Sequence, residues 1–199
     1  MGSLPLSETL SPFRPSFPTI LSASTESLPL QSLISTMHLQ KHIEGGYFVE
    51  TDRDTYQIPN PFLSCTRKAP KFNTFALLPD SSHGGTVISQ KRSASTSISY
   101  LLTPSRPQGG FHRDKARTIH TLHKGRGRYV IIHADEVRND GKARVKTFVV
   151  GRDVTNGEKL QWIVEGGKYK ASFLLEDKEG GEGSREGSLI SEVRYPLRI

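Results

Sequence analysis

The feature that most constrains the fold of this chain is a succession of short runs rich in β-branched or aromatic residues, separated by glycine- or asparagine-containing turns. Branched and aromatic side chains suit a pleated, half-buried surface, and short strands with regular turn signals are typical of sandwiches and barrels. We therefore expect an all-β, antiparallel barrel or jelly roll. The runs lie at residues 86–90, 96–103, 118–123, 129–134, 144–150, 160–165 and 169–175.

Length and composition limit the chain to one hydrophobic core. It has 199 residues, of which 34% are hydrophobic, enough to bury one core but hardly two. Residues 1–25 are rich in serine and proline and lack periodicity, so we expect a disordered tail there. The acidic, glycine-rich residues 179–187 are expected to form a mobile loop.

A short helix is predicted ahead of the barrel, over about residues 26–38. An imperfect apolar face favours it, Ser24 or Thr25 could cap it, and Pro29 fits its first turn. The barrel is expected over about residues 39–193, so that the helix and the barrel form a single domain spanning residues 26–193.

Charge and cysteine content exclude several classes of protein. The net charge is +7, but the basic residues are scattered and form no tract with stacking aromatics, which disfavours nucleic acid as a partner. The single cysteine, Cys65, excludes an internal disulfide and fits a reducing compartment. No apolar run is long enough to span a membrane, and proline interrupts any secretory signal. We expect a cytoplasmic protein that is not secreted, with the nucleus as an alternative location.

Three segments carry a resemblance to a known family. Residues 39–51 read Leu-Gln-Lys-His-Ile-Glu-Gly-Gly-Tyr-Phe-Val-Glu-Thr, residues 92–102 read Arg-Ser-Ala-Ser-Thr-Ser-Ile-Ser-Tyr-Leu-Leu, and a His-Arg pair at 112–113 precedes Gly125. In these motifs the chain resembles the Cupin_5 (DUF985) branch of the cupin superfamily, over roughly residues 38–193. The resemblance implies a double-stranded β-helix, the cupin jelly-roll barrel, open at one end on a pocket that takes a small-molecule ligand. It also implies a homodimer.

The metal-binding pattern of that superfamily is only partly kept. His112 takes the first histidine place and Asp114 the second, while Thr118 stands at the glutamate place. Lys170 stands at the histidine place of the second motif, and a protonated lysine has no lone pair for a metal. We therefore predict no metal ligands and no cofactor. A site rebuilt with His120 or His123 is the alternative, although residues three apart in a strand point to opposite faces, so only one of them can face inward.

The end of the chain also departs from the family pattern. Residues 194–199 do not resemble the family's closing strand, and Pro196 cannot donate to a sheet ladder. We expect residues 194–199 to form an atypical tail that leaves a barrel edge unpaired.

Candidate site residues follow from the resemblance and from side-chain chemistry. His112, and second to it His120, is the candidate general acid/base, because histidine titrates near neutral pH. Arg92 or Lys170 would hold an anionic group, and Glu50 and Tyr100 would contribute to the pocket. Glu44 is either a pocket-rim residue, as Glu50 is expected to be, or a partner for backbone N–H groups in the Gly45–Gly46 turn. The resemblance favours a metal-independent isomerase or epimerase that transfers a proton on a small polar or anionic molecule, because related cupins that act on sugar nucleotides use a histidine in this way without a metal. The alternatives are a non-catalytic binding protein and a metal-dependent enzyme with a rebuilt histidine site.

Overall fold

The computed structural model describes residues 25–63, 89–137, 139–176 and 184–196. The N-terminal tail up to residue 24 and most of the expected loop at 179–187 lie outside this part of the chain. So do residues 86–88 of the first expected strand, while residues 89 and 90 are not in a strand.

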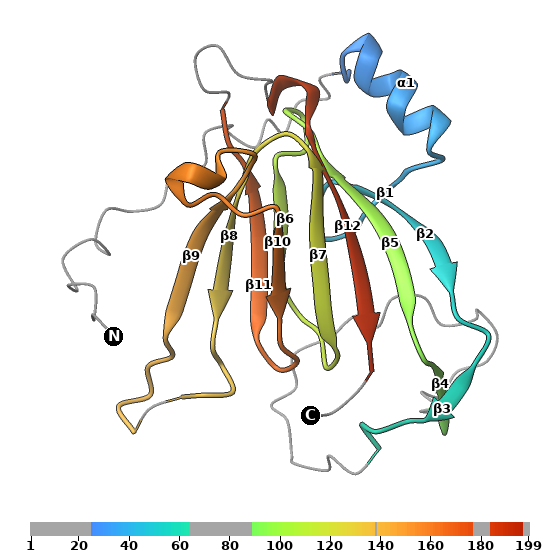
Figure 1. The fold of residues 1–199 in the computed structure, drawn as a ribbon, viewed down its shortest axis with the longest axis vertical. Helices are drawn as coiled ribbons and strands as arrows, with labels where there is room; N and C mark the ends of the chain where they lie inside the picture. Colours follow the sequence, from blue (N-terminus) through green and yellow to red (C-terminus); the bar gives the residue numbers. More distant parts are fainter. Residues whose placement is uncertain (1–24, 64–88, 138, 177–183, 197–199) are drawn as a thin grey trace.

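Two antiparallel sheets face each other and enclose the core, with a two-stranded ribbon at one end (Figure 1). The larger sheet has the order β1 (Gln40–Lys41), β2 (Tyr47–Arg53), β5 (Thr96–Leu102), β12 (Ser188–Tyr195), β7 (Arg117–Lys124), β10 (Gln161–Val164). The smaller sheet has the order β6 (Gln108–Arg113), β11 (Tyr169–Leu174), β8 (Gly127–Ile132), β9 (Val145–Val150). The ribbon pairs β3 (Gln57–Pro59) with β4 (Lys91–Ser93). The predicted all-β jelly-roll class is confirmed.

The core lies between the inner faces of the two sheets. Tyr100 and Leu102 from β5 pack there with Tyr129 and Ile131 from β8 and with Trp162 from β10. Every second residue of these strands points inward, as the alternation of side chains along a strand requires. Leu101 therefore points to the opposite face of the larger sheet, where it packs in a separate cluster.

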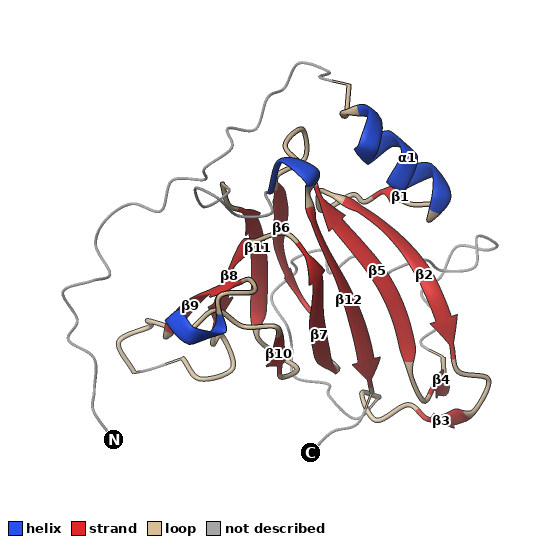
Figure 2. Cartoon of the chain, turned by 45° about the horizontal axis from the view of Figure 1, so that its top comes forward, coloured by secondary structure: helices blue, strands red, loops and turns tan. Residues whose placement is uncertain are grey.

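Helix α1 (Leu28–Thr36) covers part of that outer face, beside β1 (Figure 2). It buries Leu30 against Leu101 and Tyr47. The predicted helix is confirmed, with Pro29 in its first turn, but its N-cap is Ser27 rather than Ser24 or Thr25. Within the described residues, no helix is long and apolar enough to cross a membrane.

Strand β6 was missed by the sequence prediction, which placed no strand between residues 103 and 118. The error comes from Gly109 and Gly110, which usually indicate a turn. In the structure β6 pairs with β11, and a Cβ at Gly109 would lie 2.6 Å from both the Ser172 and the Tyr100 hydroxyl oxygens. Glycine is needed there because two side chains approach the backbone closely.

The end of β12 corrects the prediction for the C-terminus. The strand continues through Tyr195, two residues past the expected end of the barrel at Val193. It is paired on both sides, so that Arg194 lies opposite Thr96 of β5 and Thr118 of β7. The expected unpaired edge after Val193 is therefore wrong, since Pro196 lies beyond the ladder and its missing N–H removes no hydrogen bond of this strand.

Candidate functional site

A polar cavity opens between the sheets, with a volume of about 400 Å³ that includes its open mouth. Its wall is completed by Tyr100, Tyr129 and Ile98. The charged and ionisable groups come from the loop before β2, from β6, from β11 and from β12: His42, Glu44, His112, Lys170, Glu192 and Arg194.

The loop before β2 is shaped by two glycines with positive φ. Gly45 has φ 108° and Gly46 has φ 64°, conformations that side chains with a Cβ rarely adopt. A Cβ at Gly45 would also collide with the Gln108 carbonyl oxygen. The tight turn lets the Glu44 carbonyl accept a hydrogen bond from the Gly110 amide at 2.6 Å. It thereby fixes Glu44 beside β6.

His112 and Glu44 form a pair at the cavity. His112 Nδ1 lies 3.1 Å from Glu44 Oε2 and 3.0 Å from the Gly110 carbonyl oxygen. Both neighbours of Nδ1 are oxygen acceptors, so a neutral imidazole carries its proton on Nδ1 and keeps a lone pair on Nε2. Burial raises the pKa of Glu44, although the nearby His112 opposes that rise. The two side chains are 23% and 29% exposed, which leaves them open to a ligand.

His42 supports this pair from the side of the loop. Its Nδ1 accepts a hydrogen bond from the Glu44 amide at 3.1 Å, and its ring packs edge-on against Phe48. Burial, followed by the proximity of His112, lowers the pKa of His42. His42 is thus held neutral and orients Glu44.

Lys170 lies at the floor of the cavity, 2% exposed. Its ammonium is 2.8 Å from Glu192 Oε2, 3.0 Å from His120 Nε2 and 3.3 Å from Asp114 Oδ2. Burial by itself would raise the pKa of Glu192, but the neighbouring groups, Lys170 first and Arg194 among them, together outweigh burial and lower the pKa. Glu192 is therefore ionised and bound to a cation inside the barrel.

Arg194 lies next to this cluster, on the cavity wall. One of its terminal nitrogens is 3.4 Å from Asp114 Oδ1. Burial alone would raise the pKa of Asp114, but Lys170 and Arg194 together lower it. The Arg194 Nε is buried and makes no hydrogen bond within the described residues.

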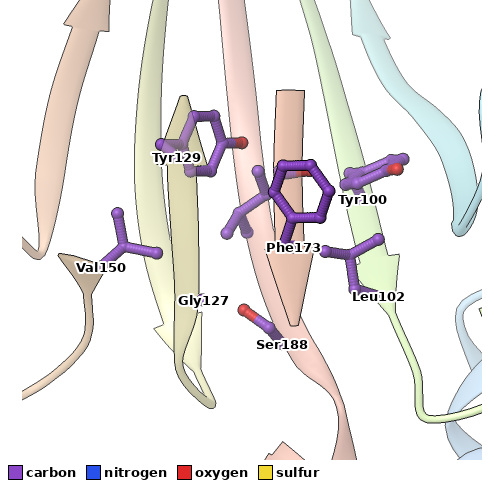
Figure 3. A pocket seen from close by; sticks show the side chains of 9 residues that line it. Tyr100, Leu102, Gly127, Tyr129, Val150, Phe173 and Ser188 are labelled. Carbon is purple, nitrogen blue, oxygen red and sulfur yellow. The ribbon is translucent and has the colours of Figure 1, made fainter. Parts of the chain in front are cut away.

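Tyr100 links the polar cavity to a second one, lined mainly by apolar side chains, whose volume of about 220 Å³ includes open solvent (Figure 3). Its hydroxyl donates to the Gly45 carbonyl oxygen at 3.0 Å. Burial raises the pKa of Tyr100, so the hydroxyl stays protonated. Tyr100, Tyr129 and Ser172 line both cavities, and the remaining walls of the second cavity include Leu102, Val150 and Phe173.

Three of the six site residues predicted from sequence line the polar cavity: His112, Tyr100 and Lys170. Glu50 and Arg92 do not belong to it. Glu50 is exposed on β2, where it pairs with Arg53 at 2.8 Å instead of reaching the cavity. Arg92 is exposed on β4, where its guanidinium lies over the Phe62 ring.

His120 lies behind Lys170, away from the cavity lining. Its ring is 0% exposed and stacks on Trp162 with ring centroids 5.1 Å apart. Burial and the Lys170 charge lower the pKa of His120 to about 3. It is neutral at physiological pH, and its Nε2 already contacts the Lys170 ammonium in the interior, which argues against the predicted acid/base role.

Sequence reasoning missed Glu192 and Arg194 as site residues. A usable signal was present, because Ile190, Glu192 and Arg194 alternate along one strand and must share a face. Two charged groups on the face of a buried isoleucine indicate a polar interior. The assignment of residues 194–199 to a tail hid this pattern.

A group of metal-ligand residue types lies elsewhere on the described surface, at His133, Asp135 and Glu136. These acceptors are already engaged by cations. The Lys168 ammonium is 2.9 Å from Asp135 and 2.6 Å from Glu136, and Arg144 is 3.0 Å from Glu136. The group is thus a surface ion-pair cluster.

Comparison with known proteins agrees with this architecture. Residues 31–196 match the family described as Cupin superfamily (DUF985). An uncharacterised protein of Saccharomyces cerevisiae, YML079W, is 42% identical over 167 residues, which cover 84% of this chain and 70% of the yeast protein.

Two solved structures share the fold. A hypothetical protein from Leishmania major aligns with a TM-score of 0.61 and 25% identity, covering 86% of this chain and 82% of that one. A protein from Shewanella oneidensis aligns with a TM-score of 0.54 and 19% identity, covering 88% and 81%. With the family match over most of the barrel and the yeast relative, these findings show that the chain belongs to the DUF985 family of the cupin superfamily.

Proposed function

We propose that the polar cavity binds a small polar molecule with an anionic or carbonyl-bearing group, and that His112 moves a proton on it, as in an isomerase or epimerase. The observation that carries this proposal is the 3.1 Å contact between His112 Nδ1 and Glu44 at the cavity wall. A histidine oriented by a carboxylate is a general arrangement for acid–base catalysis.

The direction of proton transfer follows from the hydrogen bonds of the ring. Because Nδ1 faces oxygen acceptors, Nε2 is the atom that takes a proton from a bound molecule and later returns it. An ionised Glu44 stabilises the imidazolium that forms in between. Its position on a rigid turn, tied to Gly110, keeps the pair in place without a ligand.

Arg194 is the residue best placed to hold an anionic group of the ligand. Its guanidinium has five donors, of which one terminal nitrogen contacts Asp114, and it lies on the cavity wall. Planar guanidinium donors match carboxylate or phosphate oxygens. Lys170 is less suited to this role than the sequence indicated, since its ammonium already contacts three acceptors of the protein.

The test is solvent isotope incorporation. The protein is incubated in D₂O with a panel of small hydroxy acids, keto acids and sugar phosphates, and deuterium uptake at carbon is followed by mass spectrometry. We expect uptake with at least one compound, its loss in His112→Ala, and its retention in His123→Ala, a control histidine exposed on β7. Thermal stabilisation by a compound without any deuterium uptake or product would instead identify a binding protein. The homodimer and the cytoplasmic location stay predictions from the family resemblance and the composition.

A further inference from the structure

One buried cation organises the interior of the barrel. The Lys170 ammonium contacts Glu192 from β12, His120 from β7 and Asp114 from the turn after β6. The ammonium donates hydrogen bonds to Glu192 and His120 and forms an ion pair with Asp114. No other lysine in the described residues is as deeply buried.

The three acceptors have the character of metal ligands. His120 is neutral and directs Nε2 at the ammonium, and the two carboxylates are held ionised beside it. Neutral imidazole and carboxylate oxygen are donors that divalent transition metals accept. Each acceptor comes from a different element, and all three contact the same ammonium.

The positions at which the superfamily would hold a metal do not fit one here. Thr118, at the glutamate place, is buried and offers only a neutral hydroxyl. Lys170, at the second histidine place, puts a positive charge among the remaining donors. A divalent ion between them would lie close to the ammonium, and two like charges repel strongly in a buried site.

We infer that the Lys170 ammonium is a built-in substitute for the metal ion: it neutralises the carboxylates of the barrel and excludes divalent cations from them. The inference rests on the contacts of Lys170 and stands whether or not the cavity turns over a ligand. It predicts that exchange of the ammonium for an imidazole, in Lys170→His, converts the same acceptors into a binding site for Zn²⁺ or Mn²⁺.

The experiment compares metal content in variants that all carry His133→Ala, which removes the surface group as a competing site. Each protein is stripped with a chelator, incubated with Zn²⁺ or Mn²⁺, desalted and analysed for metal. We expect about one ion per chain in Lys170→His, the stoichiometry of a single site, and only trace metal with the native lysine. Lys170→Arg keeps the positive charge and should also stay free of metal. Bound metal should raise the melting temperature of Lys170→His alone.

Two outcomes would overturn the inference. A protein with native Lys170 that retains about one ion per chain, lost on Asp114→Ala or His120→Ala, would show that the ammonium does not exclude metal. A folded Lys170→His that retains none would show that its neighbours are not a latent metal site. If Lys170→His does not fold, the proteins with lysine and arginine still decide the first point.

Discussion

Lys170 and Glu192 join the two sheets of the barrel through a contact of 2.8 Å in its interior. Lys170 lies on β11 of the smaller sheet and Glu192 on β12 of the larger one, and both are buried. A buried ion pair adds little net stability over an apolar pair, but loss of one partner leaves the other charge uncompensated. Lys170 and Glu192 therefore both line the cavity and hold the two sheets together, so a change in either residue affects the site and the stability of the fold.

Loss of the buried ammonium should destabilise the fold strongly. Lys170→Met leaves the buried Glu192 without its ion-pair partner and leaves Asp114 with Arg194 alone, and breaking such a buried pair typically costs about 3–5 kcal/mol. The corresponding fall in melting temperature is roughly 6–20 °C for a domain of this size. Lys124→Met is the matched control, because its partner Glu186 is exposed, and it should change the melting temperature much less. If Lys170→Met and Lys124→Met lower the melting temperature equally, the buried pair of Lys170 and Glu192 contributes no more to stability than an exposed pair.

Acid should weaken the protein through Glu192. Its pKa is lowered in the folded state, so its contribution to stability is complete above the unfolded value of about 4.3 and is lost as the pH falls below that value. The difference in unfolding free energy between the native protein and Glu192→Gln should therefore shrink below about pH 4. Denaturant titrations of both proteins between pH 7 and pH 3 measure this difference. If the difference in unfolding free energy between the two proteins stays constant from pH 7 to pH 3, the lowered pKa of Glu192 is contradicted.

Arg194, and not Arg92, should determine the affinity for anions. Arg194→Ala should weaken thermal stabilisation by an anionic ligand about 10-fold or more in apparent dissociation constant, the usual scale for loss of a charge-assisted contact. Arg92→Ala is the control, since Arg92 is exposed on β4 and outside the cavity. If Arg92→Ala weakens the apparent affinity for the anionic ligand more than Arg194→Ala does, the anion binds outside the cavity.

Gly45 should tolerate no side chain. Gly45→Ala places a Cβ at φ 108° and against the Gln108 carbonyl oxygen, so it adds a steric clash to backbone strain. Gly157 has φ 85°, and a Cβ added there would meet no atom within 4 Å, so Gly157→Ala reports strain alone. We expect Gly45→Ala to cost more than about 1 kcal/mol and to exceed Gly157→Ala in chemical denaturation. Equal costs would show that the contact with Gln108 relaxes freely.

Local sequence patterns were enough for the barrel and for part of its site. The spacing of branched and aromatic residues predicted six strands of the two sheets, and alternation within β5 puts Tyr100 and Leu102 on the face opposite Leu101. These features depend on neighbours along the chain, because side chains alternate in any strand. The family-like motifs likewise indicated His112, Tyr100 and Lys170, which all line the cavity.

Tertiary structure alone decided which charges meet. Glu50 and Glu44 belong to the same motif, yet the Gly45–Gly46 turn directs Glu44 to His112, while Glu50, farther along β2, is exposed and pairs with Arg53. Arg194 reached the cavity only because β12 inserts between β5 and β7, a pairing between strands distant in sequence. The residue types determined by themselves that this chain forms a barrel with a polar interior. The long-range order of the strands, which local propensity does not encode, determined that Lys170 meets His120, Glu192 and Asp114 inside the barrel.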